Sequence, residues 1–146
     1  MDETKYAYSL KTKRIKEDDF PYGGETLSSP TAVADFAKEL QDSDIERFIV
    51  LYVNSSNRLI CIQIQSGTLD QTAVYPREVA KHAILSGASS VILVHNHPSG
   101  SLNPSGADRE LTRILKDGLS LLQIRVNDHM IISEAGHYSF AEEGFL

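Results

Sequence analysis

The sequence is poor in cysteine and in long apolar runs, and each shortage excludes a class of protein. Its single cysteine, Cys61, cannot form an intrachain disulfide, which fits a reducing compartment. No apolar run approaches the roughly 18 residues of a transmembrane helix. Residues 1–5 lack the charged and then apolar layout of a secretory signal peptide. We therefore expect a cytoplasmic protein that does not enter a membrane.

Basic residues are also scarce. The chain has 14 lysines and arginines against 20 aspartates and glutamates, which gives a net charge of −6. Domains that bind nucleic acid usually carry a basic stripe. The nearest such group, within residues 11–16, is followed at once by Glu17, Asp18 and Asp19. The overall field therefore opposes nucleic-acid binding, while a local contact stays open.

The length of 146 residues fits one domain. A chain of this size buries about two thirds of the surface that its unfolded form exposes, so it needs no disulfides for stability. Residues 1–27 are polar, and an alternation of Tyr6, Tyr8 and Leu10 allows a short edge strand there. We expect residues 1–27 to be an N-terminal extension, as an edge strand, an arm or a partly disordered segment. Residues 28–146 then form the domain.

Apolar periodicity and proline positions predict the elements of that domain. Helices are expected at 30–41, 76–86 and 105–121, and strands at 48–53, 59–64, 90–94, 124–126, 130–133 and 138–140. Ile84 and Leu85 in the second helix, and Ile114 and Leu122 in and after the third, are expected on buried faces. This order of elements favours an α/β fold with a mixed sheet and helices on both faces.

A pair of histidines stands at the end of the strand predicted at 90–94. His95 and His97 are two residues apart, so in an extended chain their side chains point to the same side. Asp108 follows in the first turn of the third helix, and the loop between can fold that helix start back over the strand end. Two imidazoles and one carboxylate leave the fourth position of a tetrahedral zinc ion open for water, which is typical of catalytic zinc sites. These ligands suit zinc first, with iron, cobalt or manganese left open.

Each of these residues also has a purely structural interpretation. A His-x-His pair without further support is more often structural or incidental than a pair of ligands. Ser105-x-x-Asp108 has the spacing of a capping box, with Asp in place of the usual Glu or Gln. The two interpretations of Asp108 are compatible, because a residue in the first helical turn can cap the helix and still face a metal.

Taken together, the spacing resembles a known signature. His95-x-His97, seven residues, and then Ser105-x-x-Asp108 matches the His-x-His-x7-Ser-x-x-Asp motif of JAMM metalloproteases, the JAB/MPN domain. The string His-Asn-His-Pro-Ser-Gly at 95–100 resembles the RadC branch of that family. Pro-Arg-Glu at 76–78 and Asp-His at 128–129 do so too.

The resemblance covers about residues 28–146, most of the chain. It implies the three-layer architecture shared with cytidine deaminases, with helices on both faces of the sheet. RadC proteins often carry an N-terminal helix-hairpin-helix region, for which this chain has no room, so we expect a short form of the family.

The resemblance also implies a role for each site residue. It makes His95, His97 and Asp108 the ligands of one zinc ion per chain, and Ser105 the serine that helps to hold the attacking water or the oxyanion. Glu46, directly before a predicted strand, matches the family's general acid/base. Glu78 is a rival base in the first turn of its helix, where the helix dipole favours a carboxylate.

The other reactive side chains receive structural interpretations. We interpret His129 as a hydrogen-bonded structural residue just before a strand, and His82 and His137 as surface residues. Cys61 lies in a predicted strand and is expected in the core, because a catalytic thiol needs a base beside it.

The sequence thus favours a zinc-dependent hydrolase that cuts an amide or isopeptide bond in an unknown peptide or protein substrate. Two alternatives stay open: a non-catalytic or nucleic-acid-associated module in DNA repair or mobile-element biology, and a nuclease. The acidic net charge argues against the nuclease. So does the lack of a cluster of basic residues that could bind phosphate, since Arg109 is the one basic residue beside the ligands. We expect the loops at 66–75 and 98–104 to border the cleft, and the oligomeric state is left open.

Overall fold

A five-stranded mixed sheet forms the centre of the computed structural model, which describes residues 5–18, 20–66 and 74–146. The strands are β1 (Arg47–Val53), β2 (Leu59–Ser66), β3 (Ser90–Asn96), β4 (Arg125–Ser133) and β5 (Gly136–Ser139), in the spatial order β2-β1-β3-β4-β5. β3 and β4 run parallel, and the other neighbours are antiparallel. The mixed α/β fold predicted from the sequence is confirmed.

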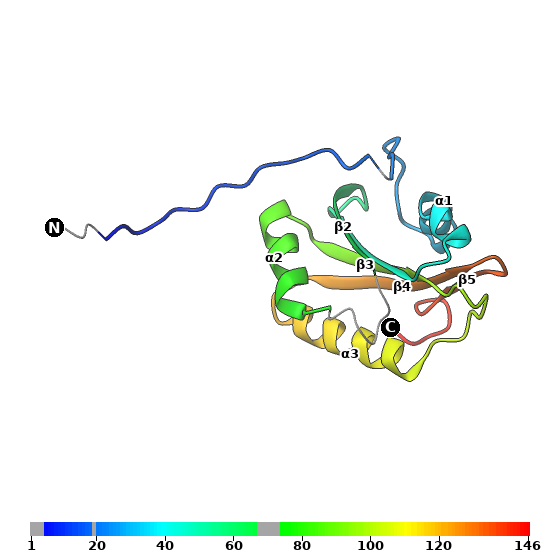
Figure 1. Ribbon diagram of the computed structural model, residues 1–146. Helices are drawn as coiled ribbons and strands as arrows, with labels where there is room; N and C mark the ends of the chain where they lie inside the picture. The colour runs from blue at the N-terminus through cyan, green and yellow to red at the C-terminus, as the bar shows by residue number, and fades with distance from the viewer. Residues whose placement is uncertain (1–4, 19, 67–73) are drawn as a thin grey trace.

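Helices cover both faces of the sheet (Figure 1). One face carries α1 (Pro30–Phe36) and the 3₁₀ helix η1 (Lys38–Asp42), and the other carries α2 (Pro76–Ser86) and α3 (Gly106–Ser120). Side chains alternate along each strand, so β1 sends Ile49 and Leu51 to the α1 face and Phe48 and Val50 to the opposite face. The sheet therefore has two separate apolar clusters, one under each helical layer.

Local signals in the sequence set the helix ends. Ser29 Oγ accepts a hydrogen bond from Ala32 N at 3.1 Å and caps α1. Ser105 caps α3 in the same way. Gly87 ends α2 with φ at 74°, a left-handed conformation that costs glycine little.

Two predicted elements differ from the structure by more than small shifts at their ends. The first helix stops at Phe36 and continues as η1, and the two short strands expected at 124–126 and 130–133 are one strand, β4. The polar residues 127–129 look like a turn in the sequence. Inside the fold Asp128 and His129 are buried and hydrogen-bonded, so the strand runs through them without a break.

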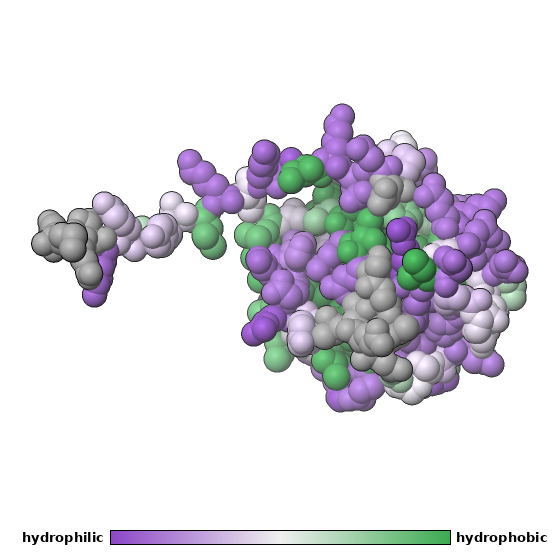
Figure 2. Space-filling view, viewed as in Figure 1, coloured by the Kyte–Doolittle hydropathy of each residue, from purple (hydrophilic) through white to green (hydrophobic). Residues whose placement is uncertain are grey.

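Some apolar residues of the helices face outward rather than inward. Ile84 is 62% exposed and Leu85 is 49% exposed, and Figure 2 shows hydrophobic surface where α2 lies. Ile114 and Leu122 are also exposed, at 38% and 50%. The prediction for these four side chains is wrong, because α2 and α3 each bury only a narrow stripe against the sheet.

The N-terminal segment has two parts. Residues 5–18 contain no helix or strand and extend away from the rest of the chain (Figure 1), so of the three forms left open for this segment the edge strand is absent at Tyr6 to Leu10. Phe20 and Leu27, in contrast, are buried in the cluster under α1. The boundary at residue 27 stays a prediction. Within the described residues, no helix is long and apolar enough to cross a membrane.

Candidate metal centre

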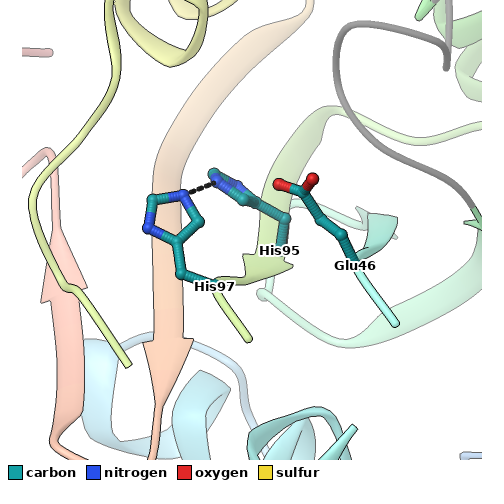
Figure 3. A group of neighbouring side chains, drawn as sticks. All are labelled: Glu46, His95 and His97. Carbon is teal, nitrogen blue, oxygen red and sulfur yellow. Dashed lines mark hydrogen bonds between the residues drawn. The ribbon is translucent and has the colours of Figure 1, made fainter. Parts of the chain in front are cut away.

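The end of β3 brings the two histidines to one side of the sheet. His95 pairs with Phe48 of β1 on one side and with Ile131 of β4 on the other. It is fully buried, while His97, one residue beyond the strand, keeps 14% of its side chain exposed. Their Nε2 atoms lie 3.0 Å apart (Figure 3). The predicted convergence of the two imidazoles is therefore present.

The N-terminus of α3 places Asp108 against this pair. Asp108 N donates to Ser105 Oγ at 3.0 Å, and Ser105 N donates to Asp108 Oδ2 at 2.8 Å, which is a complete capping box. The same carboxylate lies with Oδ1 3.2 Å from His95 Nε2 and Oδ2 3.3 Å from His97 Nε2. Asp108 thus caps the helix and faces the histidines at once.

The three side chains fit a tetrahedral metal ion. Nitrogen and oxygen ligands about 2.0–2.1 Å from zinc are about 3.3 Å from one another, and the separations here are 3.0 to 3.3 Å. His97 Nδ1 lies 2.9 Å from the Ser101 carbonyl, which only accepts, so Nδ1 carries the proton and Nε2 has a lone pair. Among the described residues, buried Asp108 Oδ1 makes no hydrogen bond. A cation bound between these atoms would satisfy Asp108 Oδ1 and the Nε2 lone pair of a neutral His97.

Glu46 completes the group from a distant part of the sequence. It stands directly before β1 and is half-buried, and one of its carboxylate oxygens lies within 4.8 Å of ligand nitrogens of His95 and His97. Figure 3 shows the carboxylate reaching toward His95 from the start of β1. Glu46, His95 and His97 together could hold a metal ion.

Asn96, which the sequence analysis passed over, fixes the backbone on both sides of Glu46. Its Oδ1 accepts from Arg47 N at 2.6 Å, and its Nδ2 donates to Ile45 O at 2.9 Å. Asn96 is 1% exposed, so these bonds are shielded from water. The residue between the two histidines therefore positions Glu46, and its place in the His-Asn-His string was the available signal.

Electrostatics at the site favour an anionic Asp108. Burial by itself raises the pKa of the Asp108 carboxyl, but the polar contacts with His95 and His97 and the hydrogen bond from Ser105 N outweigh it and lower the pKa well below the usual range. The Asp108 contact in turn raises the pKa of His97, with Glu46 adding to the effect. The carboxylate is therefore ready to bind a cation.

His129 lies behind His95, inside β4 and not before a strand as predicted. Its Nε2 is 2.8 Å from His95 Nδ1, and its Nδ1 is 2.6 Å from Thr112 Oγ1. Burial, with the nearby His95, lowers the pKa of His129 well below its ordinary value. The predicted hydrogen-bonded role is present. Thr112 was missed, although its position four residues after Asp108 on the same helix face was a usable signal.

The remaining candidates lie away from this group. Glu78 stands one turn before His82 in α2. The His82 ring stacks on Tyr52 near the end of β1 that is far from Glu46. Burial raises the pKa of Tyr52, and the charges of Cys61 and Glu78 raise it further. His82 itself is half-buried.

His137 in β5 is likewise half-buried, so the surface assignment of both histidines is only partly right. Cys61 is half-buried and packs against the apolar cluster under α2 and α3, so its core assignment is also partly right. Of the two loops expected at the cleft, 98–104 supplies the Ser101 contact to His97. Most of the other, residues 67–73, lies outside the described residues.

Known proteins resemble this chain over nearly its whole length. The family described as RadC-like JAB domain matches residues 27–145. A UPF0758 protein of Thiobacillus denitrificans is 45% identical over 153 aligned positions, which cover 100% of this chain and 67% of that relative. UPF0758 proteins of Janthinobacterium sp. and Vibrio atlanticus are 48% and 42% identical over 125 positions, or 84% of this chain and 56% of each relative. The chain thus spans between about half and two thirds of the length of these curated relatives.

Proposed function

The chain belongs to the RadC-like JAB domain family, and from this premise we propose that it is a zinc-dependent hydrolase of JAMM type, which cuts an amide or isopeptide bond in a peptide or protein. The observation that carries the proposal is the meeting of His95, His97 and Asp108 at one point, with the Glu46 carboxylate beside them. Three nitrogen and oxygen ligands with a carboxylate nearby are the parts that a hydrolytic metal site needs.

Hydrogen bonds prepare two of the three ligands for this task. A neutral His97 offers Nε2 because its Nδ1–H is bonded to Ser101 O, and Asp108 is held as an anion. A zinc ion bound there would polarise the substrate carbonyl and would lower the pKa of a water to near neutral. Mixed nitrogen and oxygen ligands support zinc as the metal, one per chain.

Glu46 and Ser105 carry the remaining steps. Glu46 accepts a proton from the water that attacks the carbonyl carbon, and delivers it to the amine nitrogen as the C–N bond breaks, leaving a carboxylate and a free amine. Ser105 Oγ already accepts the Asp108 N–H, so its own proton can be donated to the oxyanion that develops on the carbonyl oxygen.

Substitution of the proposed base tests this function. In Glu46→Gln, zinc should still bind one per chain, whereas cleavage of quenched fluorescent peptides and of a lysine isopeptide probe should fall about 10²- to 10⁴-fold. Glu78→Gln is the matched control and should keep wild-type turnover. Unchanged turnover in Glu46→Gln, in a preparation free of contaminating protease, would remove Glu46 as the base.

A second measurement separates the hydrolase from the nucleic-acid-associated alternative. Two results together would favour that alternative. The wild type would cleave no peptide probe, and DNA binding would persist after His95 and His97 are both replaced by alanine. The single cysteine supports a cytoplasmic place for the proposed activity.

A further inference from the structure

A line of buried hydrogen bonds runs from α3 through β4 to the back of His95. Thr112 Oγ1 lies 2.7 Å from Asp108 O and 2.6 Å from His129 Nδ1. His129 Nε2 lies 2.8 Å from His95 Nδ1. His95 and His129 are fully buried and Thr112 is 3% exposed, so water does not compete for these bonds.

The direction of each bond follows from which atoms can donate. A carbonyl oxygen only accepts, so the single hydroxyl proton of Thr112 goes to Asp108 O. Thr112 Oγ1 must then accept from His129, and the proton of this ring lies on Nδ1. A neutral His129 has no second ring proton, so its Nε2 accepts, and the proton of His95 lies on Nδ1. His95 Nε2 is left with a lone pair.

We propose that Thr112 and His129 are positioning residues, which hold His95 in the tautomer whose Nε2 lone pair faces the metal centre. The proposal rests on the proposed function, because it gives that lone pair a metal to bind. Thr112 also bonds the backbone of Asp108, so one hydroxyl ties together two of the three ligands. Partners of this kind behind a metal-binding histidine are typically worth about 10- to 100-fold in metal affinity.

A packing role alone would have different consequences. The His95 ring stacks on Phe48 with centroids 5.8 Å apart, and the His129 ring stacks on Phe140 at 4.7 Å. These contacts hold the planes of the two rings. Stacking does not select which nitrogen carries the proton, so the tautomer distinguishes the positioning role from simple packing.

Two substitutions at Thr112 provide a matched pair. Thr112→Val keeps the shape and removes the acceptor for His129, whereas Thr112→Ser keeps the hydroxyl. Titration of each full-length protein with zinc and with Co²⁺, whose absorption reports tetrahedral ligands, should show about 10- to 100-fold weaker binding for Thr112→Val and near wild-type binding for Thr112→Ser. Equal affinities of the two variants would overturn the proposal.

A spectroscopic measurement decides the tautomer without a metal. Long-range ¹H–¹⁵N spectra of the metal-free wild type, recorded at a pH where the His95 ring carries a single proton, should show that proton on Nδ1. A His95 protonated on Nε2 overturns the inference whether or not Thr112→Val folds. If the wild type shows the Nδ1 proton yet binds no zinc, the proposed function fails while the hydrogen-bond assignment stands.

Discussion

The two faces of the central sheet are made from alternate residues of the same strands and have different contents. On the α1 face, β3 and β4 contribute Val94 and Met130 to an apolar cluster. On the α3 face, the adjacent residues His95 and His129 are hydrogen-bonded to each other, and His95 also faces Asp108. Buried polar groups need partners, and α3 supplies them on its own face only. A shift of one residue along β3 or β4 thus moves a side chain from an apolar cluster to the metal centre.

From this comparison we expect substitutions on the two faces to have different effects on folding and on metal affinity. Changes in the apolar cluster on the α1 face should alter the free energy of unfolding and leave metal affinity unchanged. Changes at the α3 end should alter metal affinity by more than they alter folding. The predictions below run from the largest expected effect to the smallest.

Loss of a core side chain on the α1 face should have the largest effect on folding. Leu51 is fully buried, so Leu51→Ala leaves a cavity and should cost about 2–5 kcal/mol of stability, measured by urea unfolding. The folded fraction of this variant should bind zinc with wild-type affinity. A clear loss of affinity would mean that the two faces are coupled, contrary to the comparison.

Removal of the metal should lower the free energy of unfolding, because the ligands at the α3 end lose the ion that they bind. Zinc at about 100 times its dissociation constant should raise the free energy of unfolding by about 2.7 kcal/mol, and a chelator should reverse the gain. His97→Ala should abolish this difference, whereas Leu51→Ala should keep it, since its ligands are intact. Thermal unfolding with and without chelator measures both. An undiminished zinc effect in His97→Ala would show that the ion binds elsewhere.

The two serine caps form a matched pair, one on each face. Ser29 Oγ accepts from Ala32 N, and Ser105 Oγ accepts from Asp108 N, so alanine at either position should cost about 1 kcal/mol. Only Ser105→Ala should also weaken zinc binding, because its cap orients a ligand. Zinc titration of both variants tests this, and an equal effect on affinity would contradict it.

The smallest effect concerns a titratable group in β4. Burial raises the pKa of Asp128 above the ordinary 3.8, against hydrogen bonds from Ser139 and two backbone N–H groups. The native state therefore binds the proton more tightly than the unfolded chain does. The contribution of Asp128 protonation to the free energy of unfolding is fully present below pH 3.8, and it is lost as the pH rises through the native pKa.

Asp128→Asn removes this titration. The unfolding free energy of the wild type relative to this variant should fall as the pH rises from about 4, by at most about 1.4 kcal/mol per pH unit. Urea unfolding of both proteins over this range measures the difference. A difference that does not change with pH would show that Asp128 has the same pKa folded and unfolded.

Local patterns were sufficient for much of the fold and for part of the site. The order of elements, the shared side of His95 and His97, and the capping box of Ser105 and Asp108 all follow from spacings of two to four residues. Glu46 entered through family resemblance, because a carboxylate before a strand is otherwise indistinguishable from a solvated charge. Its roles and those of the ligands stay predictions that the experiments above address.

Other features depended on contacts between distant segments. The run 127–129 looks like a turn until Asp128 and His129 find partners inside the fold. Asn96, about 50 residues further along the chain, is hydrogen-bonded to the backbone of the two residues on either side of Glu46. Such pairings depend on strand register and helix docking, which residue periodicity does not contain.

The sequence by itself determined that two imidazoles share one side of β3 and that Asp108 stands in the first turn of α3, because strand and helix periods are local properties. Only the tertiary structure decided that Glu46, Thr112 and His129 meet them. The reason is physical: the register of β1 and β4 against β3, and the packing of α3 on the sheet, arise from burial of the whole chain.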